Sequence, residues 1–116
     1  MSDEQLMVEV VDRGPDYLIS VSGEMDFGTN AEFLRVVQPL AQSGRSLVLD
    51  LADLAFCDSS GLGALVRVHK MTEEAGGTLC LARLQPQIKS TVTLTMLHRL
   101  FHLSEDLPDA GAALNH

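Results

Sequence analysis

The sequence is short of basic residues, with eight lysines and arginines against sixteen aspartates and glutamates in 116 residues. A protein that binds nucleic acid needs clustered lysine and arginine side chains to contact phosphates. The basic residues here are scattered and the formal net charge is -8, so nucleic acid is not expected as a partner. A basic protein partner is compatible with this charge.

Metal-binding and disulfide-forming residues are also scarce. The two cysteines, Cys57 and Cys80, are each flanked by apolar residues, which favours buried thiols over a disulfide or a metal pair. The histidines show no metal-ligand spacing with cysteines or carboxylates. They are His69, His98, His102 and His116. We therefore expect no metal and no cofactor.

No apolar run approaches the roughly 20 residues that cross a bilayer, and the first ten residues lack the basic and apolar regions of a secretion signal. The composition, 46% hydrophobic and 21% charged without low-complexity segments, is typical of globular proteins. We expect a single domain over residues 1–116, located in the cytoplasm, with no membrane contact.

The most informative stretch is residues 46–66, SLVLDLADLAFCDSSGLGALV. Its first half is a nearly continuous apolar run, which predicts an interior strand. Asp58, Ser59 and Ser60 then offer three capping side chains in a row, followed by apolar residues at helical spacing from Leu62 onward. The pattern predicts a strand, a short turn and a helix that ends at glycines 76 and 77.

A serine at a helix N-terminus lies beside unpaired backbone N–H groups at the positive end of the helix dipole. One interpretation is that Ser59 or Ser60 is an ordinary helix cap, worth about 1 kcal/mol. The other is a site that accepts a negative charge. The redundancy of Asp58, two serines and two glycines favours the second, because one cap needs only one serine.

The run FCDSSGLGALV resembles the signature of the STAS domain of bacterial anti-sigma factor antagonists. The resemblance covers nearly the whole chain, about residues 6–107. In that family the first serine of the turn is phosphorylated by the anti-sigma factor, which implies Ser59 as the modified residue. The resemblance further implies partner contacts by Asp58, Ser59, Ser60, Gly61 and Leu62.

Residues 23–26, Gly-Glu-Met-Asp, resemble a second motif of the family at the end of its second strand. This likeness gives Asp26 a role in partner binding beside the turn. The alternative is that Asp26 is a loop aspartate that caps the next helix or faces solvent. Thr29 and Glu32 have the spacing of a capping box at the start of that helix, and Pro39 predicts a kink or an early end.

The remaining elements follow from shorter patterns. Residues 6–12 and 17–22 are expected to form a hairpin around a Gly-Pro-Asp turn, and residues 78–82 a further strand. The threonine-rich segment 91–96 alternates like a strand, but the family has a helix here and Pro86 marks a helix start. Residues 100–103 are expected to form a brief edge strand and residues 109–114 a short terminal helix.

These elements predict an α/β, STAS-like single domain. An N-terminal antiparallel hairpin continues into a mixed, mostly parallel sheet of four or five strands with three or four helices. The loops at the carboxyl ends of parallel strands cluster at one edge of such a sheet. Asp26 and the turn at 58–60 are therefore expected to be neighbours.

The function implied by the resemblance is that of an anti-sigma factor antagonist. The unphosphorylated form would bind an anti-sigma factor, a serine kinase with a histidine-kinase-like ATPase fold, and so release a sigma factor. Phosphorylation of Ser59 would switch binding off, and a Ser/Thr phosphatase would reset it. The chain itself would have no catalytic residue.

Two alternatives stay open from the sequence. The helix N-terminus could bind a small anion or nucleotide, although no glycine-rich phosphate loop is present. The chain could also be a STAS subunit of a larger signalling or transport assembly. A hydrolase using Ser59 is disfavoured, because the turn is not Gly-x-Ser-x-Gly and no positioned histidine is evident.

Overall fold

The computed structural model describes residues 6–112. Its elements, in chain order, are β1 (Leu6–Asp12), β2 (Asp16–Met25), α1 (Asn30–Ala41), β3 (Ser46–Asp50), β4 (Leu54–Cys57), α2 (Ser59–Glu74), β5 (Leu79–Ala82), α3 (Pro86–Leu94), the single 3-10 turn η1 (Leu97–Arg99) and β6 (His102–Ser104). The predicted α/β class, with an N-terminal hairpin leading into a mixed sheet, is confirmed.

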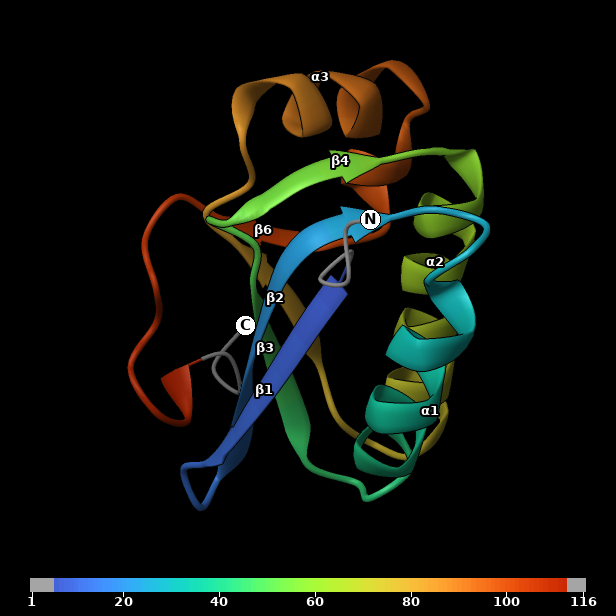
Figure 1. Ribbon diagram of the computed structural model, residues 1–116. Helices are drawn as coiled ribbons and strands as arrows, with labels where there is room; N and C mark the ends of the chain where they lie inside the picture. Colours follow the sequence, from blue (N-terminus) through green and yellow to red (C-terminus); the bar gives the residue numbers. More distant parts are fainter. Residues whose placement is uncertain (1–5, 113–116) are drawn as a thin grey trace.

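The sheet has the order β1-β2-β3-β5-β6, with β4 pairing with β2 outside this path. β1 and β2 form the predicted antiparallel hairpin, and every later pairing is parallel (Figure 1). Parallel pairing follows from the helical crossovers, which return the chain to the same end of the sheet before β3, β5 and β6, whereas β4 follows β3 after a short loop.

The described sheet has six strands rather than the four or five expected. The additional strand is β4, which the sequence pattern merges with the turn after β3. The ten-residue β2 is long enough to pair with β3 through Asp16–Ser20 and with β4 through Gly23–Met25. An irregularity in register between Gly23 and Glu24 accompanies the second pairing, as a bulge that bends a strand does.

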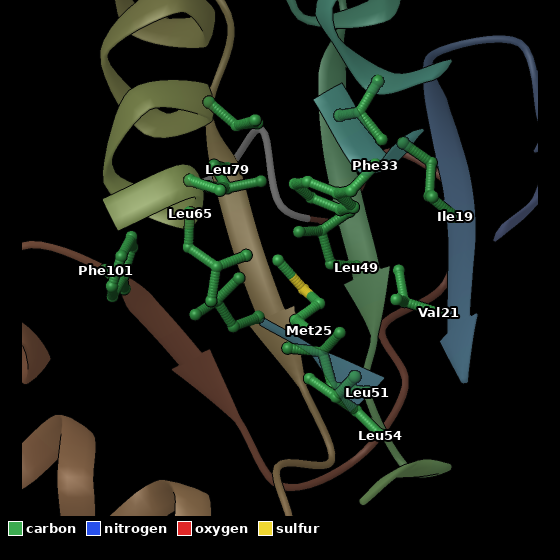
Figure 2. Packing of buried hydrophobic residues seen from close by; sticks show 14 of the residues in the cluster. Ile19, Val21, Met25, Phe33, Leu49, Leu51, Leu54, Leu65, Leu79 and Phe101 are labelled. Atoms are coloured by element: carbon green, nitrogen blue, oxygen red, sulfur yellow. The ribbon is translucent and has the colours of Figure 1, made fainter. Parts of the chain in front are cut away.

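Helices α1 and α2 lie side by side on one face of the sheet (Figure 1). Each helix buries one apolar face, which includes Phe33 and Val37 of α1 and Leu65 and Val68 of α2. Figure 2 shows Phe33 and Leu65 among the inward residues of the strands, close to Met25, which is fully buried. Burial of this continuous apolar layer is the main force that holds the helices against the sheet.

The opposite face of the sheet carries a smaller apolar cluster of Val48, Cys80 and Ala82, against which Leu107 packs. The segment after β6 is attached to the hairpin through Asp16, a fully buried residue. Its carboxylate binds the Arg13 guanidinium at 2.8 Å and accepts a hydrogen bond from the Gly111 N–H at 3.0 Å.

Residues 91–94 of the threonine-rich segment are helical, as predicted, and end α3, which has Pro86 in its first turn, whereas residues 95 and 96 form the turn that follows. The threonine hydroxyls of α3 donate to carbonyl oxygens four residues earlier, from Thr91 to Gln87 and from Thr93 to Lys89, at 3.1 and 2.9 Å. These bonds satisfy the hydroxyls within the helix, so the alternation of threonines does not require a strand.

Three further expectations meet the structure in different ways. α1 continues through Pro39 and ends two residues later, as expected for an early end near a proline. The brief last strand exists, but as β6, which starts two residues after the predicted position. In the segment predicted as a helix at residues 109–114, the Ala112 N–H closes a turn on the Asp109 carbonyl oxygen at 3.0 Å, and the last two residues lie outside the described range.

Candidate functional site

The two sequence motifs meet where β2 and β4 end. These strands run parallel with Met25 opposite Cys57, so Asp26 and Asp58 each follow the last residue of a strand at the same end. The Asp58 N–H donates to the Met25 carbonyl oxygen at 3.2 Å, which joins the two loops directly. The predicted proximity of the Asp26 segment and the serine turn is present in the structure.

Asp58 is the N-cap of α2. Its backbone is extended, with φ of -87° and ψ of -173°, and its carboxylate accepts a hydrogen bond from the Gly61 N–H at 2.9 Å. The same oxygen accepts from the Ser60 hydroxyl at 2.7 Å. A carboxylate at this position satisfies an otherwise unpaired N–H group and matches the positive end of the helix dipole.

The two serines of the turn therefore differ in their surroundings. Ser60 is half-buried and its hydroxyl is bound to Asp58. Ser59 is exposed, and its hydroxyl has no hydrogen-bond partner among residues 6–112. As the first residue of α2, it stands at the positive end of the helix with a hydroxyl that a reactant can approach from solvent.

Gly61 and Leu62 lie behind this exposed serine rather than beside it on the surface. Gly61 is buried, and a Cβ atom there would lie 2.8 Å from both the Cys57 sulfur and the Met25 carbonyl oxygen. Leu62 is 5% exposed and belongs to the main core. Any part that these two residues play in partner binding is indirect, because both are buried in this structure.

Asp26 is half-buried and organises its own loop. One carboxylate oxygen accepts hydrogen bonds from the Gly28 and Thr29 N–H groups, at 2.9 and 3.1 Å. The alternative interpretation of Asp26, a loop aspartate at the start of the next helix, therefore describes its contacts. Asp26 also lies beside the serine turn, as the sequence predicted. Its carboxylate therefore holds in place the loop that is next to that turn.

The predicted capping box at the start of α1 is wrong. Thr29 makes no side-chain cap and instead accepts from the Asp26 N–H and donates to the Glu24 carbonyl oxygen, both at 2.9 Å. Glu32 forms an ion pair with Arg35 at 2.7 Å. The Thr29 N–H donates to the Asp26 carboxylate and not to the Glu32 side chain. The hydrogen bonds of this local turn therefore replace those of a capping box.

Phe27, which follows Asp26, is the most exposed large apolar residue among those described, at 88% exposed. It is not among the site residues predicted from the sequence. Its exposure could have been predicted from its place in the sequence, because an aromatic residue between Asp26 and Gly28 lies in a turn without a packing partner close in sequence. Exposed aromatic side chains are enriched in protein interfaces.

The electrostatics of the turn are fixed by hydrogen bonds. The Gly61 N–H and then the Ser60 hydroxyl hold the pKa of Asp58 below its usual value, with a smaller contribution from the Phe27 N–H. Asp58 is therefore an anion at neutral pH, and it connects the two loops. Burial raises the pKa of the nearby Cys57 thiol to about 12, with the Asp58 charge adding to the effect. Cys57 is thus an unreactive thiol.

The described residues include no group of three or more histidine, cysteine, aspartate or glutamate side chains that could hold a metal ion. Both cysteines are free thiols. No helix between residues 6 and 112 combines the length and the apolar character that crossing a membrane requires.

Comparisons with known proteins show what the chain is similar to as a whole. A family model described as the STAS domain matches residues 7–110. The chain is 30% identical over 97 residues to an anti-sigma-B factor antagonist of Bacillus subtilis, covering 84% of this chain and 89% of that protein. It is 29% identical over 101 residues to the protein of that name in Staphylococcus aureus, covering 86% and 94%.

Among solved structures, the fold is similar to that of an anti-sigma factor antagonist from Mycobacterium paratuberculosis. The TM-score is 0.81 at 26% identity, and the likeness covers 100% of each chain.

Proposed function

The chain belongs to the STAS domain family, and from this premise we propose that it is an anti-sigma factor antagonist gated by phosphorylation of Ser59. The unphosphorylated form binds an anti-sigma factor and thereby frees a sigma factor. In this proposal the chain is a substrate of a kinase and not itself an enzyme. The names of its relatives support the general function.

The observation that carries the assignment to Ser59 is the contrast between the two serines. The Ser60 hydroxyl donates to Asp58 at 2.7 Å, so transfer of a phosphoryl group to that oxygen would remove the donated proton and break a hydrogen bond of the helix cap. The Ser59 hydroxyl is exposed and has no partner among the described residues, so phosphorylation there requires no rearrangement of the turn.

The charge of the phosphate explains why modification would end binding. A phosphoserine adds roughly -1.5 to -2 charges, which the N-terminus of α2 stabilises by about 0.3–2 kcal/mol in the free protein. In a complex the same charge would be desolvated beside the Asp58 carboxylate, at a cost of several kcal/mol. A loss of about 3–4 kcal/mol weakens binding roughly 100- to 1000-fold.

The partners in this proposal come from the family. The anti-sigma factor is a serine kinase with a histidine-kinase-like ATPase fold that phosphorylates Ser59, and a Ser/Thr phosphatase removes the phosphate. Asp26, Asp58, Ser59 and Ser60 line the surface that meets the kinase, with Gly61 and Leu62 fixing its shape from behind. The exposed Phe27 extends this surface on the side of the Asp26 loop.

The test mixes the purified chain with labelled ATP and the purified serine-kinase anti-sigma factors of its source organism. We expect one kinase to transfer a single phosphate, located on Ser59 by mass spectrometry, and to bind the unmodified chain. Ser59→Asp should reduce that affinity at least about 100-fold, whereas Ser59→Ala should bind but not accept phosphate.

Ser60→Ala is the matched variant for the turn. We expect it to slow phosphorylation without abolishing it, because Asp58 retains its bond from the Gly61 N–H. Phosphate found on position 60, or a Ser59→Asp variant that binds as tightly as the unmodified chain, would contradict the proposal.

A further inference from the structure

The sheet ends on one side in a long strand that is paired along one edge only. β1 is the first strand in the order β1-β2-β3-β5-β6, and within residues 6–112 it pairs with β2 alone (Figure 1). It has seven residues, against three in β6 at the opposite end of the sheet. A free strand edge presents N–H and C=O groups to which another strand can bond.

The hairpin register shows which backbone groups lie on this free edge. The Arg13 N–H donates to the Asp16 carbonyl oxygen at 3.0 Å, and the β1–β2 register continues from this pair without a shift. Hydrogen-bonded and non-hydrogen-bonded pairs alternate along an antiparallel ladder, so the odd-numbered residues of β1 bond to β2. The even-numbered residues therefore direct their N–H and C=O groups outward. They are Leu6, Val8, Val10 and Asp12.

The side chains of β1 are apolar and exposed. Met7, Val10 and Val11 are 47%, 40% and 53% exposed. Natural edge strands are usually protected from pairing by lysine, proline, a bulge or a very short length. β1 contains no lysine or proline, and its pairing with β2 has no bulge. The strand is therefore open to a further strand on its outer side.

The charges of β1 indicate what kind of strand can pair with it. Both terminal nitrogens of the Arg45 guanidinium bind the Asp12 carboxylate, at 2.8 and 3.2 Å, so this carboxylate is already neutralised. Glu9 is then the one charged side chain of β1 without an ion-pair partner among the described residues. An edge with one open charge and three exposed apolar side chains fits an apolar, nearly neutral strand. β1 of a second copy has that composition.

From these observations we propose that two copies of the chain associate through their β1 strands, antiparallel about a two-fold axis, to form one continuous sheet. Such a contact uses the same surface on both copies and leaves no free β1 edge. The inference does not rest on the proposed function, because the serine turn lies outside β1.

Bonding and charge select one register for this contact. Outward residues of one copy bond to outward residues of the other, so the axis passes through a residue of β1. An axis at Glu9 places two carboxylates directly opposite each other, which is destabilising. An axis at Val8 leaves the exposed Val11 outside the pairing, and an axis at Val11 pairs only residues 10–12. An axis at Val10 pairs residues 8–12 of both copies and brings the two Val10 side chains together.

The first experiment is sedimentation equilibrium of the chain over a series of concentrations. The mass of the wild type is expected to rise from 12.6 kDa towards twice that value. Val10→Lys/Val11→Lys is expected to raise the dimer Kd at least about tenfold. Leu94→Lys/Met96→Lys adds the same charge at two exposed apolar residues outside β1 and is expected to leave this Kd within about twofold.

Two results of this experiment would overturn the proposal. One is a wild type that stays monomeric at every concentration, which leaves the β1 edge to a strand of another protein. The other is an equal dimer Kd for the two double variants, which places the contact outside β1.

The second experiment tests the register by disulfide formation and does not depend on a lysine variant that folds. Opposite residues of a hydrogen-bonded pair have Cα atoms about 5.5 Å apart, within the roughly 4.4–6.8 Å that a disulfide spans. Val10→Cys is therefore expected to form at least about ten times more disulfide-linked dimer under mild oxidation than Met7→Cys. The two Met7 residues are about as exposed as Val10 but would lie roughly 20 Å apart along the strands.

The wild type is the second control for cross-linking, because it retains Cys57 and Cys80 as free thiols. Equal cross-linking of Val10→Cys and either control, measured by non-reducing electrophoresis, would overturn the register.

The third experiment uses salt to identify the force that holds the dimer. Each copy carries a formal net charge of -8, and the two Glu9 side chains would lie near each other, so charge opposes this contact. Raising the salt concentration and Glu9→Gln are each expected to lower the dimer Kd at least about twofold. A dimer that weakens as salt is added is held by ion pairs and would overturn the proposal.

The two proposals of this article fail separately. If the chain is monomeric while a kinase phosphorylates Ser59 and Ser59→Asp no longer binds that kinase, this inference fails and the proposed function stands. If the chain dimerises through β1 but neither binds nor accepts phosphate from any of the kinases, the proposed function fails and this inference stands.

Discussion

Replacing Gly61 by alanine is expected to destabilise the fold, because the new methyl group has no space. It would lie 2.8 Å from both the Cys57 sulfur and the Met25 carbonyl oxygen. That oxygen cannot move freely, since it accepts the Asp58 N–H at 3.2 Å and belongs to the paired ends of β2 and β4. Either the Cys57 side chain rotates or the first turn of α2 moves away from the sheet.

The magnitude follows from two opposing effects. Overpacking of a core typically costs about 1–3 kcal/mol. Alanine in a helix interior is more favourable than glycine by roughly 0.5–1 kcal/mol. The net loss for Gly61→Ala is then about 0.5–2 kcal/mol, whereas Gly63→Ala, which meets nothing within 4 Å, is expected to gain roughly 0.5–1 kcal/mol. The difference between the two variants isolates the steric cost.

The assay is thermal unfolding of the two variants side by side, followed by circular dichroism. With about 4 °C per kcal/mol for a domain of this size, Gly61→Ala should melt about 4–12 °C below Gly63→Ala. If the two variants melt within about 2 °C of each other, the close packing of the turn against β2 is not what requires glycine at position 61.

Three further expectations concern charge and burial. The hydrogen bonds that lower the Asp58 pKa stabilise the fold fully above its ordinary value of 3.8 and are lost as pH falls through the lower folded value. The midpoint of thermal unfolding of Asp58→Asn should therefore fall less steeply than that of the wild type as the pH is lowered below about 4. Midpoints that fall in parallel for the two proteins would contradict this. The Cys57 pKa of about 12 predicts that iodoacetamide at pH 8 labels the native chain at least tenfold more slowly than the urea-unfolded chain, measured by mass spectrometry; equal rates would refute its burial. Asp16→Asn weakens the hydrogen bonds to Arg13 and Gly111 and should lower the free energy of unfolding, measured with urea, by about 1–3 kcal/mol. An unchanged urea midpoint would contradict this.

The start of α2 could be predicted from the sequence because its signals are local. A capping aspartate, an apolar helical stripe and two closing glycines all lie within twenty residues, and they agree with one another. The parallel direction of the later strands followed from the alternation of elements and from the family resemblance. The position of Asp26 beside the turn followed from that topology.

The features that the sequence did not predict depend on choices between equally plausible local contacts. Four residues of β4 sit inside a longer apolar run, and their pairing with the far half of β2 is not a local property. Thr29 fits a capping box by spacing, yet the Asp26 carboxylate three residues earlier takes its N–H. Which of two adjacent serines Asp58 would bind could not be read from spacing, because both lie within reach of a cap.

That last choice decides how the proposed switch can work. Asp58, Ser60 and Gly61 are held by hydrogen bonds and close packing, so the turn has little freedom to respond when a neighbour is modified. Ser59 takes no part in those contacts, and a phosphate on it would change the charge of the surface before it changed the shape of the fold. A ligand or modification shifts an equilibrium only through its different free energies in the two states. In the proposed mechanism those states are the free and the bound chain, so the energy that releases the partner must arise where Ser59 meets it.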